Sequence, residues 1–312
     1  MATRGKILNQ INNLKNGGQD IVRRQYLNKL YKYTGNDTII YLASFPCNIP
    51  GVSSDAISIN LNDINGFMSC LNGLKSKKLD LIIHSPGGSL EATEQLVLYL
   101  RSKYDYIRAI IPQNAMSAAS MLACACDEIV MGKHSVIGPI DPQMRLMKNN
   151  GASYFLPAHS ILADFEQAKI DISADKNAAN VWVPKLLDIP MGFLDLCNKT
   201  IKLSQDKVGE WLDSYMFKND PIKKGHEIAS WLGDFGEHKT HGRPINIELA
   251  KQKGLKVKKL EDDQELQDRV LSVFHAAMLT FDTTQCVKII ENHKGKGSFT
   301  VVQAHAHLVP GR

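Results

Sequence analysis

Residues 79–101, LDLIIHSPGGSLEATEQLVLYLR, give the clearest indication of the fold class. The first part is a short apolar run that ends at a Pro-Gly-Gly turn, a pattern typical of a buried strand. The residues that follow the turn have the periodicity of a helix. A buried strand, a tight turn and a helix form the unit from which mostly parallel sheets with crossover helices are built.

The same alternation of strand and helix continues on both sides of this unit. Further strands are expected at 37–45, 106–112, 127–132 and 286–292, and helices at 1–35, 59–74, 117–126, 151–169, 189–217 and 263–281. Residues 241–257 predict a loop with a short helix, and residues 295–312 predict a weakly packed tail. The sequence therefore predicts an α/β protein with a C-terminal helical extension.

Composition narrows the class of protein. The 312 residues are 44% apolar and 22% charged, and 37 Lys and Arg against 32 Asp and Glu give a net charge of +5. This small, dispersed excess does not indicate a nucleic-acid partner. No secretory signal follows the first residues and no apolar run reaches the ~18 residues of a membrane span, so a cytoplasmic protein is expected.

Cofactor and metal signals are also missing from the sequence. The six cysteines show no C-x-x-C spacing and are expected to be buried, reduced thiols. The HAH triplet at 305–307 is expected to be exposed, so we predict no metal site. No G-x-G-x-x-G fingerprint occurs, and no cofactor is expected.

Two predicted strand ends carry unusual residues, and reactive groups gather at the carboxyl ends of strands in open α/β sheets. At the first, Gly87 and Gly88 allow unusual backbone angles, and their amides can point at a developing oxyanion. His84 either lines the substrate cleft or is a buried structural histidine. We assign His84 and Ser89, which flank the turn, to substrate binding.

The second strand end reads NAMSAAS, residues 114–120. Ser117 is expected at the start of a helix, where the amide of Ala118 has no partner within the helix. It is therefore either a nucleophile beside an oxyanion-binding amide or an ordinary helix cap. Ser120 lies one turn further along the same helix face, away from the free amides.

These motifs together carry a family resemblance. LDLIIHSPGGSLEATEQLVLYLR, AMSAASMLACACDEIVM and SVIGPIDPQM, followed by THGRPINIELAKQKGLKV and CVKIIENHKGKG, resemble the clan of Clp protease and signal peptide peptidase A. Within that clan, roughly residues 20–300 most resemble the serine dehydrogenase proteinase family. The resemblance implies a ClpP/crotonase-like fold, serine peptidase activity and assembly into homo-oligomers.

The resemblance also implies site residues. Ser117 stands ten positions before Asp127, which selects it as the nucleophile, whereas alignment on AASM would select Ser120. The oxyanion donors map onto the amides of Gly87 or Gly88 and of Ala118. Relatives often have Ser-Gly-Gly or Ser-Ala-Gly where this chain has Ser-Ala-Ala.

The general base is a separate question, because the clan uses either a lysine or a His-Asp pair. Lys199 is the first candidate, since its helix is similar to the one that carries a lysine in the family. Lys169 is the second, and His241 in the THGRP loop is a further alternative. Asp141 in GPIDPQ is interpreted as a carboxylate that fixes a loop.

Taken together, these features predict a helical segment at 1–35, a peptidase domain at 36–262 and a C-terminal helix and tail at 263–312. The predicted function is a cytoplasmic serine peptidase that forms an acyl-enzyme on Ser117 with a lysine base and acts on a peptide or protein substrate. Two alternatives remain, a non-catalytic oligomeric scaffold and a crotonase-like acyl-CoA enzyme.

Overall fold

The chain folds into two compact units. The computed structural model describes residues 3–14, 17–46, 52–147 and 153–302. The first unit comprises Met1–Ile137 together with Asn246–Arg312, and the second is Gly138–Ile245. This division differs from the expected one, because the C-terminal segment belongs to the same unit as the N-terminal helices.

A seven-stranded sheet forms the centre of the first unit, in the order β11-β10-β1-β2-β3-β5-β9. The strands are β1 (Asp37–Ala43), β2 (Lys78–His84), β3 (Tyr106–Ile111), β5 (Glu128–Met131), β9 (Val257–Lys259), β10 (Cys286–Asn292) and β11 (Gly297–Val301). The five strands from β1 to β9 pair in parallel, whereas β10 runs antiparallel to β1 and to β11. The predicted mostly parallel sheet is confirmed.

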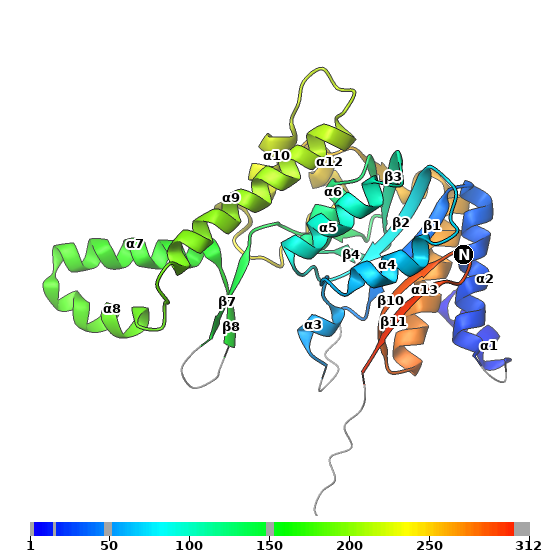
Figure 1. The fold of residues 1–312 in the computed structure, drawn as a ribbon, viewed down its shortest axis with the longest axis horizontal. Coiled ribbons are helices and arrows are strands. Elements are labelled where there is room, and N and C mark those ends of the chain that lie inside the picture. The colour runs from blue at the N-terminus through cyan, green and yellow to red at the C-terminus, as the bar shows by residue number, and fades with distance from the viewer. Residues whose placement is uncertain (1–2, 15–16, 47–51, 148–152, 303–312) are drawn as a thin grey trace, which may run out of the picture. The chain divides into compact units, whose positions relative to one another are not determined.

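Helices cover both faces of this sheet (Figure 1). On one face lie α2 and α13, and on the other lie α4, α5 and α6. The helices of the first unit are α1 (Arg4–Asn12), α2 (Gly18–Thr34), α3 (Ser54–Ile57), α4 (Asp63–Leu71), α5 (Leu90–Arg101), α6 (Ala118–Cys124), α12 (Ile247–Gln252) and α13 (Gln264–Thr283). The main core contains side chains of α2, α13 and the central strands, among them Leu30, Ile82 and Val273.

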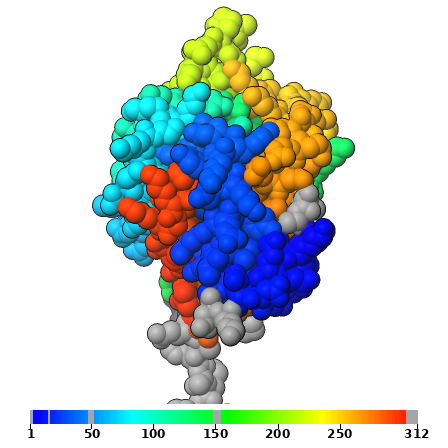
Figure 2. All heavy atoms as spheres, turned by 90° about the vertical axis from the view of Figure 1, so that its right-hand side faces the viewer, coloured from blue at the N-terminus to red at the C-terminus, as the bar shows by residue number. Residues whose placement is uncertain are grey.

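The two ends of the chain meet in this unit. Figure 2 shows α1 and α2 in blue beside α13 in orange and β11 in red. Ile7 and Ile11 of α1 pack with Ala276 and Leu279 of α13 in a second core cluster. Because β11 pairs with β10, the prediction of a weakly packed tail is wrong for Gly297–Val301. The HAH triplet lies outside the described residues.

The second unit combines a β-hairpin with helices. Its elements are β7 (Gln143–Met147), β8 (Ser153–Pro157), α7 (Ala158–Ala174), α8 (Ala179–Leu186), α9 (Phe193–Trp211), α10 (Gly225–Leu232) and α11 (Phe235–His238). The helix expected from residue 151 begins only after Pro157, because the preceding residues pair with β7 instead. Ile161 and Cys197 contribute to the core of this unit.

The cysteines and the lengths of the helices bear on two predictions made from the sequence, those of buried thiols and of no membrane span. Cys70, Cys124, Cys126, Cys197 and Cys286 are free and buried, as predicted, and Cys47 lies outside the described residues. Burial raises the pKa of Cys124 to about 12, so that thiol is inert. None of the helices in the described part of the chain is both long and apolar enough to cross a membrane.

Candidate active site

The glycine turn and the serine-bearing helix meet at the carboxyl end of β2. The amide of Ser85 donates to the carbonyl of Asn114 at 3.0 Å, and the amide of Met116 donates to the carbonyl of Ser85 at 3.0 Å. These two bonds connect the end of β2 to the short strand β4 (Asn114–Ala115), which ends two residues before Ser117. The two motifs singled out from the sequence are therefore neighbours in the structure.

Gly87 is the point of closest approach between them. It has a φ of +102°, and a Cβ atom there would lie 2.7 Å from Ser117 Cβ and 3.0 Å from the amide nitrogen of Ala118. Only a residue without a side chain permits such an approach. The turn thus brings together Gly87, Ser117 and Ala118.

Ser117 adopts an unusual backbone conformation, with φ 52° and ψ −122°. Such a conformation is strained for a residue with a side chain, and strain of this kind clusters at functional sites. Ser117 directly precedes α6 and is partly exposed, yet its side chain makes no capping hydrogen bond. The alternative of an ordinary capping serine, which accepts a bond from the helix amides, does not match this geometry.

Backbone amides on both sides of this junction lack a hydrogen-bond partner among the described residues. One belongs to Ala118, the first residue of α6, and another to Gly88, which is exposed. The amide of Gly87 donates instead to Ser85 Oγ at 3.1 Å. Of the two glycines assigned to the oxyanion hole, Gly88 is therefore the one whose amide is available.

Ile59 holds the backbone on both sides of Gly88 by hydrogen bonds along one edge. Ile59 pairs with it as a parallel bridge, because the Ile59 amide donates to the Gly87 carbonyl at 2.7 Å and the Ser89 amide donates to the Ile59 carbonyl at 2.9 Å. In an extended strand, successive amides point to opposite edges. The Gly88 amide consequently points away from Ile59.

Ser120 has a different environment from Ser117. It is completely buried, and its hydroxyl donates to the carbonyl of Ala115 at 2.7 Å. This bond ties the first turn of α6 to the end of β4. The hydroxyl of Ser120 is engaged in holding the loop that carries Ser117.

The two residues assigned to substrate binding have structural partners. His84 is completely buried, its Nε2 donates to the carbonyl of Phe45, and its Nδ1 accepts from the Asn114 amide at 3.1 Å. Burial lowers the pKa of His84 to about 4, so the ring is neutral at pH 7 and holds the strand ends together. Ser89 caps α5, because its hydroxyl accepts from the Ala92 amide at 3.1 Å.

The candidate bases Lys199, Lys169 and His241 all belong to the second unit. Lys199 forms an ion pair with Asp195 at 2.7 Å and its side chain is 74% exposed. Lys169 pairs with Glu166 at 2.8 Å and is 59% exposed. Neither amine has the desolvated surroundings that a catalytic lysine needs.

His241 has surroundings of another kind. Its Nδ1 lies 2.9 Å from Oδ1 of Asp141, whose side chain is fully buried, while the histidine itself is 27% exposed. Asp141 also accepts a bond from the side-chain amide of Gln143 at 2.8 Å. The carboxylate interpreted from sequence as a loop-fixing group thus orients a histidine as well, a pairing that no spacing rule could find across 100 residues.

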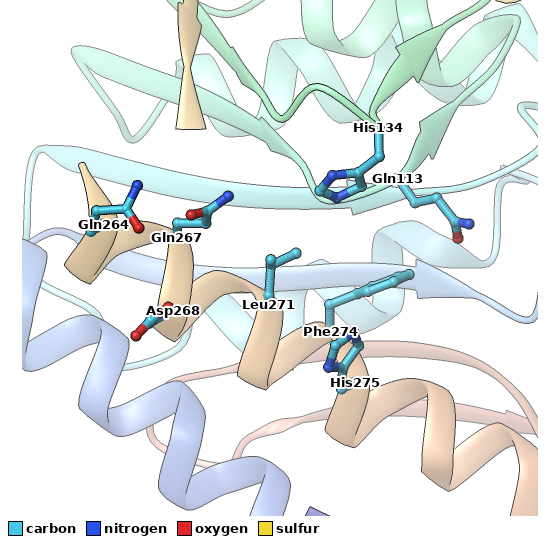
Figure 3. A pocket seen from close by; sticks show the side chains of 8 residues that line it. All are labelled: Gln113, His134, Gln264, Gln267, Asp268, Leu271, Phe274 and His275. Atoms are coloured by element: carbon cyan, nitrogen blue, oxygen red, sulfur yellow. The ribbon is translucent and has the colours of Figure 1, made fainter. Parts of the chain in front are cut away.

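A cavity that no sequence motif predicted lies at α13 (Figure 3). It has a volume of about 580 Å³ and is lined by Gln113, His134, Gln264, Gln267, Asp268, Leu271, Phe274 and His275. Phe274 also packs edge-on against His84, with ring centroids 5.1 Å apart. Neither Ser117 nor Gly88 is among its lining residues. No group of three or more potential metal ligands gathers in the described ranges.

Comparison with known proteins gives relatives for this chain. Two uncharacterized proteins of Methanocaldococcus jannaschii are 33% identical over 184 residues and 35% identical over 182 residues. These matches cover 59% and 57% of this chain and 54% and 51% of the relatives, so the chain spans about half the length of the curated relatives it matches.

A solved structure, that of a serine-to-alanine mutant of a membrane-bound stomatin-specific protease, is 14% identical, with a TM-score of 0.36. The match covers 68% of this chain and 79% of that one. A family model, that of the ClpP-like SDH-type serine proteinases, matches residues 60–296. This match includes the glycine turn, Ser117 and every candidate base, and it shows that the chain belongs to the family of ClpP-like SDH-type serine proteinases.

Proposed function

We propose that this protein is a serine peptidase that cleaves peptide bonds through an acyl-enzyme on Ser117. The observation that carries the proposal is the strained, partly exposed Ser117, packed against Gly87 beside two amides that have no partner in the described residues. A nucleophile next to oxyanion donors is the arrangement that acyl transfer needs.

The proposed reaction has two steps. Ser117 Oγ attacks the substrate carbonyl carbon and passes its proton to a base, while the Gly88 and Ala118 amides stabilise the developing oxyanion. The protonated base then gives this proton to the leaving amine as the peptide bond breaks. In the second step, water attacks the ester and releases the acid and the free serine.

The substrate in this proposal is an extended peptide. Gly88 is exposed, and its amide and carbonyl point away from Ile59, so a peptide strand can pair with that free edge. Assembly into homo-oligomers and a cytoplasmic location belong to the same proposal and rest on the resemblance to the clan of Clp protease and signal peptide peptidase A.

Local chemistry ranks the candidates for the general base. A histidine whose Nδ1–H donates to a buried carboxylate is held in the tautomer that leaves Nε2 as the proton acceptor. The His241–Asp141 pair has this form, whereas Lys199 is an exposed partner of Asp195. We therefore place His241 first and keep the Ser117–Lys199 dyad as the alternative.

Hydrolysis of quenched fluorescent casein tests the proposed activity. We expect cleavage by the wild type, no cleavage by Ser117→Ala, and roughly half the wild-type rate or more for Ser120→Ala, because Ser120 only holds the loop. Cleavage that survives Ser117→Ala would contradict the proposal and would favour the scaffold or acyl-CoA interpretation.

Two further variants test the base. His241→Gln should lower the rate at least about 100-fold, the contribution typical of general base catalysis, while Lys199→Met should leave it nearly unchanged. The reverse pattern would contradict the assignment of His241 and establish the lysine dyad.

A further inference from the structure

A buried polar network lies behind the glycine turn. Lys288 Nζ of β10 pairs with Asp63 Oδ1 of α4 at 2.7 Å, and the two side chains are 2% and 5% exposed. The hydroxyl of Tyr41, on β1, donates to the other carboxylate oxygen of Asp63 at 2.5 Å. Three elements of the first unit are thus joined at one carboxylate.

The same network holds the residues on each side of Ile59. Lys288 Nζ donates to the carbonyl of Ser58 at 2.8 Å, and the amide of Asn60 donates to Asp63 Oδ2 at 3.0 Å. Ile59 in turn bonds to both residues that flank Gly88, as described above. Lys288 and Asp63 are therefore connected to the Gly88 peptide by hydrogen bonds to Ser58 and Asn60, by the backbone of Ile59 between them, and by the hydrogen bond from Ile59 to the Gly87 carbonyl.

The backbones of Ile59 and Gly88 pack closely against each other. A Cβ atom at position 88 would lie 2.5 Å from the Ile59 nitrogen and closer still to its carbonyl oxygen. Because the two backbones are in direct contact, a shift of Ile59 has to shift Gly88. The geometry of the available amide is therefore set by the position of Ile59.

Stability alone does not account for such a network. Taking an ion pair out of water costs free energy, and an apolar replacement of the same volume is often as stable or more so. Burial also raises the pKa of the Tyr41 hydroxyl well above its usual range, so Tyr41 stays a donor to Asp63 at any working pH. A fully satisfied polar network does fix one geometry of the groups around it.

We propose that Lys288, Asp63 and Tyr41 are positioning residues that set the Gly88 amide against Ser117. This inference rests on the proposed peptidase function, in which that amide stabilises the oxyanion. In this proposal the three residues act through Ser58, Ile59 and Asn60.

The kinetics of inactivation by a fluorophosphonate probe test this role. Lys288→Met removes the cation and both of its bonds, and Tyr41→Phe removes one bond with little change of shape. We expect kinact to fall about 10- to 100-fold in Lys288→Met and about threefold in Tyr41→Phe, with KI unchanged, since sub-ångström misplacement of an oxyanion donor slows only the chemical step.

A matched control separates positioning from loss of stability. Asp80 and Arg108 form another ion pair with a fully buried carboxylate, with Nε and Oδ1 2.8 Å apart, at the amino end of β2 away from the turn. Asp80→Asn should lower the melting temperature as the Lys288 and Tyr41 variants do, yet leave kinact unchanged. Wild-type kinact in folded Lys288→Met, or in Tyr41→Phe where Lys288→Met does not fold, would overturn the proposal.

Hydrogen–deuterium exchange tests the positioning without any activity. The peptide that spans residues 86–92 includes the Ser89 amide, which bonds to Ile59. Its exchange should become at least about tenfold faster in Tyr41→Phe and Lys288→Met than in Asp80→Asn. Equal exchange would overturn the positioning role, whereas faster exchange in a protein that no probe labels would contradict the peptidase function alone.

Discussion

At the scale of single residues, backbone strain marks the candidate nucleophile. Ser117 and Lys239 are the non-glycine residues with positive φ in the described ranges, and Ser117 lies against the glycine turn. Small neighbours and the position before a helix predicted Ser117 from the sequence. The strain itself was not predictable, since it arises from the packing of Met116 and Ser117 against Gly87, 30 positions earlier in the chain.

This strain predicts an unusual order of stabilities. At most backbone positions, a variant with Gly is less stable than one with Ala, because glycine gives the unfolded chain more conformational freedom. At φ 52°, the Cβ of alanine is strained, so Ser117→Gly should be more stable than Ser117→Ala by about 1 kcal/mol, with both variants inactive. Urea unfolding of the two variants measures the difference, and a more stable alanine variant would mean that Ser117 is unstrained.

His84 makes a second prediction, on pH. Its folded pKa of about 4 lies below the usual value of 6.5, so the unfolded chain binds the proton first as the pH falls. The stability that the neutral ring contributes is complete above pH 6.5 and is lost as the pH falls toward 4.

Between pH 7 and pH 5, the contribution of His84 to the free energy of unfolding should fall by about 2 kcal/mol. Urea unfolding of the wild type and of His84→Asn at both values isolates it, because the other titrating groups are common to the two proteins. The same pH dependence in both would show that His84 is protonated as readily in the fold as outside it.

At the scale of elements, apolar runs and turn residues predicted most of the central sheet. The β2 strand, the turn at Pro86, and α5 follow one another as the sequence indicates. The sequence did not predict the segment around Ile59, which pairs with the glycine turn through a single bridge. Nor did it predict the buried ion pair of Asp63, because its partner Lys288 is 225 positions away.

The surroundings of Gly73 and Gly88 predict which alanine substitution lowers stability more. Gly73 and Gly88 both have positive φ, but a Cβ at Gly73 would meet only Lys296 Nζ, at 3.8 Å, whereas one at Gly88 would overlap the Ile59 backbone. Gly73→Ala should therefore cost about 1 kcal/mol from the backbone alone, and Gly88→Ala about 3 kcal/mol or more. Chemical denaturation of both variants gives the two costs, and equal values would mean that Ile59 yields freely.

At the scale of the whole molecule, the C-terminal segment completes the first unit. The sequence suggested a separate helix and tail from residue 263, but β10 is an inner strand beside β1, and α13 buries Val270, Val273 and Ala277 against the sheet. Local patterns predicted both elements, yet their place depends on contacts across more than 200 residues. The pairing of His241 with Asp141 was not predictable for a similar reason, since the two residues are 100 positions apart in the chain.

Removal of this segment should abolish the fold. A chain cut after residue 262 loses β10, β11 and α13, which exposes the apolar faces of β1 and α2. We expect no cooperative thermal transition for the truncated chain by circular dichroism, and a transition for the full chain. Cooperative unfolding of the truncated chain would show that 263–312 is a separate appendage.

Covalent labelling shows whether Ser117 is an activated nucleophile, as we propose. The purified protein is treated with a fluorophosphonate probe, and the modified peptide is identified by tandem mass spectrometry in the wild type, Ser117→Ala and Ser120→Ala. We predict one adduct, on Ser117, that is absent from Ser117→Ala and retained in Ser120→Ala. An adduct on Ser120, or a folded wild-type protein that takes up no probe, would contradict the claim.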